Sequence, residues 1–425
     1  MKIKNIHAYE ILASGGYPTI ECRVELNDGS VGVASVPYGV SAGIHEAIVL
    51  LDHDASRWDG HGMSQAIANI NDKIATALVG QDASAQRQID QIMINQDGTP
   101  NKAELGGNAI LAVSVAVARA SAESAGIELY QYLIDTFQTG FNPKELPRPM
   151  TVVIEGGKHA DRTTDLQEYC LTATRDSTVS ENVRMIMETY HQLASVLKEN
   201  NFSVNVGNEG AFAPSGIHSN EAPLAYMLEA IKRAGYVAGQ DISISLDAAA
   251  SEFYELGTYN LKLENRSLTA GELISYYETW LKKYPIVTIE DMLAQDDWDN
   301  WSKLKIIAYG HHTDLIGDDL TVTNVERLQK AIDLQAISAI LIKLNQVGTI
   351  SETIDCCLLA KKHGLMTVTS HRGGGETNDT AMIDVAVAVG SRYIKVGPTR
   401  GERVSKYNRL MAIERALGLV PPRYN

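Results

Sequence analysis

The sequence predicts an α/β protein, a (β/α)8 TIM-type barrel behind an N-terminal α+β domain. Two observations predict this fold class. In the second half of the chain, short apolar runs recur about every 30 residues, the length of one strand–helix unit in such a barrel. The first third instead shows extended segments followed by Ala-rich helical segments. At 425 residues the chain is long enough for both parts.

The N-terminal domain, residues 1–134, begins with three expected strands. They are rich in β-branched residues in near-alternation, and the turn signals SGGYP and NDG separate them. These strands cover residues 6–12, 19–26 and 30–36. Such short spacings predict an antiparallel meander.

Helical periodicity follows from Gly43 to Tyr132. Its clearest segments are the Ala-rich or apolar stretches 44–51, 63–78 and 109–125. Residues 135–149 are proline-containing and aperiodic, and we expect them to link this domain to a barrel over residues 150–425.

The expected barrel strands end in polar or ionisable residues. In this fold the catalytic groups lie at the C-terminal ends of the strands. The ends are Ser245–Asp247, Ile289–Asp291, Gly317–Asp319, Ile342–Asn345, Ser370–Arg372 and Ile394–Lys395.

The charge disfavours two classes of partner, and the cysteine content bears on the compartment. The net charge of −15 and the pI near 5.2 disfavour nucleic acid and anionic membranes. Four scattered cysteines without a CxxC pair favour a reducing compartment over a disulfide or zinc framework. Without a signal-like or membrane-spanning apolar stretch, we expect a cytoplasmic protein with no nucleic acid and no membrane insertion.

Three carboxylates fall on successive expected strand ends: Asp247, Glu290 and Asp318. Hard oxygen ligands around one mouth suit Mg²⁺, and a cation would relieve their mutual repulsion. The alternative is that each is an ordinary exposed acid at a strand end. Lys343 and Lys395 end later runs, and Lys343 lies in the apolar segment AILIKLNQVG. A neighbouring cation and metal would lower the pKa of Lys343 and make it a base, unless it is a solvated lysine at a strand edge.

Several other polar residues lie in expected loops, and those flanked by glycines let the backbone approach a ligand closely. Arg372 precedes Gly373–Gly375 and could hold a phosphate or carboxylate bidentately. Each residue of this set is, taken alone, equally explained as part of a loop. The set is Glu168, Glu209, His159, Ser370, His371 and Arg372.

Together these segments resemble the enolase family. The matching stretches run in the family's order along nearly the whole chain. They are DGTPNKAELGGNAILAVSVA, GGKHA, LQEY, GNEGAFAP, SLDAAASEFY, IEDMLAQDDW, GDDLTVTN, LIKLNQVGTISE, SHR with GETNDT, and GERVSKYNRL.

The resemblance implies an N-terminal α+β cap on a modified (β/α)8 barrel, and the dehydration of 2-phospho-D-glycerate to phosphoenolpyruvate. It implies Mg²⁺ on Asp247, Glu290 and Asp318, with Lys343 as the base. Glu209 would be the acid, assisted by Glu168. It also implies a homodimer or a higher oligomer built from dimers. The implied contacts to the small phosphorylated carboxylate substrate are His159, Gln167, Ser370, His371, Arg372, Gly373 and Lys395.

The sequence departs from the family pattern at several loops. The lid loop SGASTG reads Tyr38–Gly43, so Tyr38 replaces the serine that helps to bind a second Mg²⁺. SHRSGE has gained a residue and reads SHRGGGE, with glycines at 373–375. NGGSHAGN has become EGGKHAD from Glu155, and GDEGGFAP has become GNEGAFAP.

These departures leave three interpretations open. The first is an enolase. The second is a paralogue that carries out the same Mg²⁺-assisted β-elimination on a related phosphonate or carboxylate. The third is a catalytically silent binding protein on the same scaffold, against which the retained acids and lysines argue.

Overall fold

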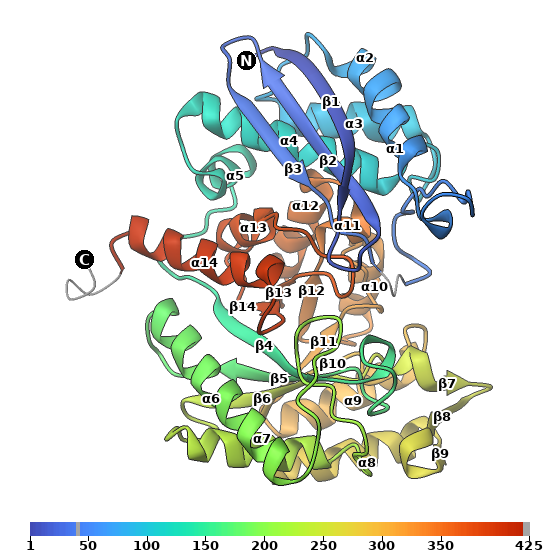
Figure 1. Ribbon diagram of the computed structural model, residues 1–425, viewed down its shortest axis with the longest axis vertical. Helices are drawn as coiled ribbons and strands as arrows, with labels where there is room; N and C mark the ends of the chain where they lie inside the picture. The colour runs from blue at the N-terminus through green and yellow to red at the C-terminus, as the bar shows by residue number, and fades with distance from the viewer. Residues whose placement is uncertain (40–42, 420–425) are drawn as a thin grey trace.

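The computed structural model describes residues 1–39 and 43–419, and its first three strands form the predicted antiparallel meander. β1 (Ile3–Leu12) pairs with β2 (Pro18–Leu26), and β2 pairs with β3 (Val31–Ser35). Their apolar residues alternate with exposed ones, as a sheet with one buried face requires. Figure 1 shows this sheet in blue at the top of the molecule, with the barrel below it.

Helices cover the buried face of this sheet. The longest, α4, packs on β2 and β3 and is buried on nearly all sides, which explains its Ala- and Val-rich sequence. It ends at Gly126, whose positive φ of 67° suits glycine. The helical elements here are η1 (Trp58–Gly60), α1 (Ser64–Ala68), η2 (Asn69–Ile74), α2 (Ala75–Leu78), α3 (Gln86–Asp97), α4 (Gly107–Ala125) and α5 (Leu129–Phe137).

The segment 44–51 is not helical, so that expectation was wrong. Its backbone groups bond to other parts of the chain instead of to one another. The Ala47 N–H donates to Gln346 O at 2.8 Å, and the Ile48 N–H donates to Asn101 O at 2.8 Å. These tertiary hydrogen bonds outweigh the weak helical preference of a short segment.

Eight strands close into the predicted barrel, in the order β10-β11-β12-β13-β14-β4-β5-β6. β5 runs antiparallel to both neighbours, whereas the other neighbouring pairs are parallel. The cause is the connection after β4, a loop with one short turn, η3 (Gly157–His159), in place of a crossover helix. The strands are β4 (Arg148–Glu155), β5 (Glu168–Ala173), β6 (Ile242–Asp247), β10 (Ile286–Glu290), β11 (Asp314–Gly317), β12 (Ala339–Ile342), β13 (Met366–Ser370) and β14 (Tyr393–Val396).

Helices surround the barrel (Figure 1). Two of them lie between β5 and β6, and the later ones follow the strands in turn. They are α6 (Val179–Glu199), α7 (Ala222–Arg233), α8 (Ala270–Lys283), α9 (Trp298–Gly310), α10 (Val325–Asp333), α11 (Leu344–Val347), α12 (Ile350–Lys362), α13 (Ala381–Val389) and α14 (Gly401–Ala416). A small excursion after β6 holds η4 (Ala250–Phe253), β7 (Tyr254–Glu255), β8 (Thr258–Leu261), η5 (Lys262–Glu264) and β9 (Arg266–Leu268).

The N-terminal part packs onto the barrel through α3, α4 and α5, which contact α12, α11 and α13. α5 ends at Phe137 and β4 begins at Arg148, with neither helix nor strand between them. The domain boundary at 135–149 stays a prediction.

No single helix among the described residues is long and apolar enough to cross a membrane; α4 and α5 reach that length and hydropathy only as a pair bent by 98°.

Candidate active site

The barrel mouth holds a cavity of about 230 Å³ lined mainly by polar and charged side chains. It is formed by the C-terminal strand ends and the loops that follow them. Because β5 runs backward, its first residue, Glu168, lies at this mouth beside Asp247. Of the predicted site residues, all but Glu290 line the cavity, and Glu290 is buried next to Lys395.

Lys395 lies at the centre of three carboxylates. Its Nζ is 2.8 Å from Glu168 Oε2, 2.9 Å from Asp247 Oδ2 and 2.8 Å from Glu290 Oε1. All four side chains are almost completely buried. Burial raises the pKa of Glu290 well above its usual value, with Asp247 adding to the effect. The Lys395 ammonium therefore offsets a repulsion that three buried acids would otherwise suffer.

Lys343, the predicted base, lies 2.5 Å from Asp318 through Nζ and Oδ2. The other oxygen of Asp318 accepts from Gln346 Nε2 at 2.7 Å. Burial alone would lower the pKa of Lys343, but the Asp318 carboxylate raises it above the usual value. The sequence led us to expect a lowered pKa for Lys343, and the chain without metal shows the opposite. The attraction of Asp318 for the ammonium outweighs its repulsion by Arg372 and Lys395.

A group of three aspartates at this mouth could hold a metal ion. Ligand atoms of Asp291, Asp318 and Asp319 all lie within 4.8 Å of one another. The Asp291 carboxylate accepts from the backbone N–H groups of Asp318 at 3.0 Å and Asp319 at 2.7 Å. Burial and the neighbouring Asp318 raise the pKa of Asp319 to about 7. Burial likewise raises the pKa of Asp291, whereas, against the effect of burial, Lys343 lowers the pKa of Asp318. Three crowded carboxylates fit a hard divalent cation that prefers oxygen ligands.

The predicted ligands Asp247, Glu290 and Asp318 come from three adjacent strand ends at the same mouth. Only Asp318 belongs to the aspartate group, while Asp247 and Glu290 pair with Lys395. Asp291 and Asp319 close two of the strand ends expected from the sequence but were not predicted as ligands. The available signal was that each directly follows a predicted ligand, Glu290 or Asp318.

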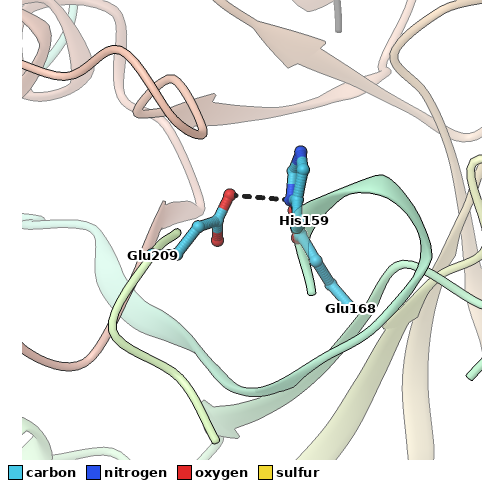
Figure 2. A group of neighbouring side chains, drawn as sticks. All are labelled: His159, Glu168 and Glu209. Atoms are coloured by element: carbon cyan, nitrogen blue, oxygen red, sulfur yellow. Dashed lines mark ion pairs between the residues drawn. The ribbon is translucent and has the colours of Figure 1, made fainter. Parts of the chain in front are cut away.

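On the opposite wall, His159 pairs with two glutamates. Its Nδ1 lies 3.1 Å from Glu209 Oε1 and 3.3 Å from Glu168 Oε1, and Figure 2 shows the Glu209 carboxylate turned toward the imidazole ring. Burial opposes the imidazolium, but Glu209 and Glu168 raise the pKa of His159 to about 10. His371 Nε2 lies 3.4 Å from the other oxygen of Glu209. Against the opposing effect of burial, both histidines lower the pKa of Glu209 well below its usual value.

Arg372 forms a buried ion pair with a residue that the sequence analysis assigned no role, Glu46. Arg372 Nη1 lies 2.8 Å from Glu46 Oε2, and Nη2 lies 2.9 Å from Oε1. Glu46 Oε1 also accepts from the Gly43 N–H at 2.8 Å. No sequence pattern marks Glu46 as a site residue, because it lies in the segment predicted to be a helix. Only the tertiary fold brings it to the barrel.

Tyr38 lies beside the glycine-rich loop and does not line the cavity. Its N–H donates to Gly375 O at 3.1 Å, and its buried hydroxyl lies near Gly15. The remaining lid residues, Val40 to Ala42, lie outside the described residues. A Cβ on Gly373 would lie 2.5 Å from Glu209 Oε1, and one on Gly375 would lie 2.2 Å from Tyr38 O. The contact at Gly375 is with the backbone, so that position requires glycine, whereas a side chain at Gly373 would have to displace the Glu209 and His159 side chains.

Two family models match the chain. One, described as the enolase C-terminal TIM barrel domain, matches residues 143–423. The other, described as the enolase N-terminal domain, matches residues 3–133. Together they cover nearly the whole chain.

Proposed function

The chain belongs to the enolase family, whose fold carries a lyase site for a divalent metal ion, and from this premise we propose that it dehydrates 2-phospho-D-glycerate to phosphoenolpyruvate with Mg²⁺. The observation that carries the proposal is the juxtaposition of Lys343 and Glu209 on the walls of one acidic cavity. A β-elimination requires such a base and acid on either side of one substrate.

Lys343 would remove the proton next to the substrate carboxylate, a carbon acid so weak that the developing charge must be stabilised. Asp247, Glu290 and Asp318 would hold the cation, which when bound supplies electrostatic stabilisation of that enolate-like charge. Lys395 would add a fixed positive charge from the chain itself. Lys343 must be uncharged to act as a base, so its pairing with Asp318 has to loosen before proton transfer.

The leaving hydroxide needs a proton from the other wall. His159, Glu168 and Glu209 lie close enough to share one, and Glu209 is proposed as the donor with Glu168 assisting. Because the two histidines favour ionised Glu209 in the chain alone, Glu209 has to take the shared proton from His159 before it can donate it to the leaving hydroxide. The Arg372 guanidinium would bind the phosphate, since its planar fork matches oxyanions. Gln167, Ser370, His371 and Gly373 line the same cavity and would complete the substrate contacts.

A second candidate function is the same elimination on a related phosphonate or carboxylate. It is favoured by the glycine-rich loop, because Gly373–Gly375 offer no side chain to a phosphate. Tyr38 likewise contributes nothing to the cavity lining.

An assay of phosphoenolpyruvate formation from 2-phosphoglycerate separates the two candidates. Turnover of roughly 1–1000 per second supports the first. Its absence, with Mg²⁺ binding retained, supports the second. The base is tested by Lys343→Ala, which should abolish exchange of the substrate α-proton with solvent deuterium while Mg²⁺ still binds. The exposed Lys362→Ala is the matched control and should exchange like wild type.

We also propose a homodimer, or a higher oligomer built from dimers, as the assembly. Sedimentation velocity across a range of concentrations tests it, and a monomer throughout that range would refute it.

A further inference from the structure

A buried carboxyl group, Glu155, lies directly behind the candidate acid and takes no part in the proposed chemistry. It is the last residue of β4, it is 0% exposed, and it stands opposite Glu168 in the β4–β5 pairing. It is also one of the positions at which this chain departs from the enolase pattern, which has asparagine there.

The side chain of Glu155 holds the backbone of the loop that carries Glu209. The Glu209 N–H lies 3.2 Å from both Glu155 oxygens, and the Ala211 N–H donates to Oε1 at 3.0 Å. A Cβ on Gly207 would lie 2.5 Å from the Glu155 carboxyl carbon, so the loop passes directly over this group. Glu155 thereby fixes the position of the Glu209 main chain.

The carboxyl group of Glu155 has no ion-pair partner in the part of the chain that the structure describes. The cation that acts on it, His159, pairs with Glu168 and Glu209 instead. The ionisable groups that face Glu155 are Glu209, Glu168, His159 and Tyr190. A buried carboxylate without a cation is costly, so the neutral acid is the favoured form.

We propose that Glu155 is a positioning residue for Glu209, which it holds through backbone hydrogen bonds while keeping a proton of its own beside the catalytic acid. This inference rests on the proposed function. The charge state agrees with the balance of forces, because burial, followed by the charge of Glu209, raises the pKa of Glu155 to about 8. Below that pH the group is neutral, and above it a second negative charge appears next to Glu209.

The test compares wild type with Glu155→Gln, which keeps an acceptor for the loop but cannot ionise. The pH profile of kcat/KM for 2-phosphoglycerate should show an inflection near pH 8 that the variant lacks. Asp90→Asn is the control, because Asp90 is also a buried acid that accepts a backbone N–H, at the distant α3–α12 contact. This control should leave the inflection in place.

A second measurement does not depend on turnover. Because the folded state keeps a proton that the unfolded state releases above about pH 4.5, wild type loses folding stability as the pH rises toward 8. The folding constant of wild type relative to Glu155→Gln should fall up to about tenfold per pH unit in this window. Equal pH dependence of unfolding in the two proteins would overturn the proposal. If wild type does not turn over 2-phosphoglycerate, the proposed function fails while this comparison still decides on Glu155. Should the glutamine variant not fold, Glu155→Asn, the residue of the family pattern, replaces it.

Discussion

Lys395 Nζ lies 2.8 Å from Glu290 Oε1, although the two residues are far apart in sequence and belong to different strands, β14 and β10. The same ammonium contacts Glu168 and Asp247, so one lysine holds together acids from three further strands. Among the described residues, Asp247 and Glu290 rely on this ammonium for charge compensation, whereas Glu168 also pairs with His159.

Lys395→Met should therefore destabilise the protein by about 3–5 kcal/mol, the usual cost of leaving buried charges unpaired. Urea denaturation followed by circular dichroism measures this. Mg²⁺ should recover more stability in the variant than in wild type, because a divalent cation can neutralise the released carboxylates. Wild-type stability of the variant without metal would show that the three acids are already protonated.

The strand ends were the most predictable part of the molecule. Asp247, Glu290 and Lys395 were placed from the sequence because an ionisable residue after a buried run marks the mouth of a barrel. The residues that were missed depend on tertiary contacts. Glu46 pairs with Arg372 across 326 residues of sequence, and no local pattern encodes that contact.

The backbone conformation of two segments could also not be predicted from the local sequence. Residues 44–51 have helical periodicity, yet their N–H groups bond to the barrel and to the loop before α4. The reversed direction of β5 follows from the loop over 156–167, whose length and glycines favour a return as readily as a crossover. In both cases long-range hydrogen bonds decide the outcome.

Glu46→Gln should weaken substrate binding through Arg372. The substitution removes the negative charge that orients the Arg372 guanidinium, whose Nη1 and Nη2 atoms lie 2.8 and 2.9 Å from the two Glu46 carboxylate oxygens. We expect KM to rise roughly 10- to 100-fold, corresponding to the loss of a charged hydrogen bond of about 1.5–3 kcal/mol, with a smaller change in kcat. Steady-state kinetics test this, with the exposed Glu145→Gln as control. An unchanged KM would mean that Arg372 does not need Glu46 for its orientation.

Gly373→Ala should inactivate the enzyme without unfolding it. The added Cβ would lie 2.5 Å from Glu209 Oε1 and 2.7 Å from His159 Cε1, so the pair has to shift. A displacement of this size at an acid costs roughly 100-fold in kcat/KM. Gly271→Ala in α8 is the matched control, because nothing lies within 4 Å of its Cβ, and it should gain about 0.5–1 kcal/mol of stability at wild-type activity. Full activity of the Gly373→Ala variant would show that the loop backbone shifts and leaves the Glu209 side chain in place.

Glu376 should make the folded protein sensitive to acid. Its buried carboxylate lies 3.2 Å from Lys406 Nζ and accepts from the backbone N–H groups of Arg372 and Thr377. Burial alone would raise the pKa of Glu376, but Lys406, with help from His371, lowers it below its usual value. The group therefore contributes stability that is complete above its unfolded pKa of about 4.5 and is lost as the pH falls toward the lower folded value. In urea titrations between about pH 3 and 6, wild type should lose stability on acidification more steeply than Glu376→Gln.

The glutamine variant starts about 3–5 kcal/mol lower in its free energy of unfolding at neutral pH, because Lys406 then lacks its charge partner. Parallel curves for the two proteins would mean that Glu376 is already protonated in the fold and that Lys406 is neutralised in another way.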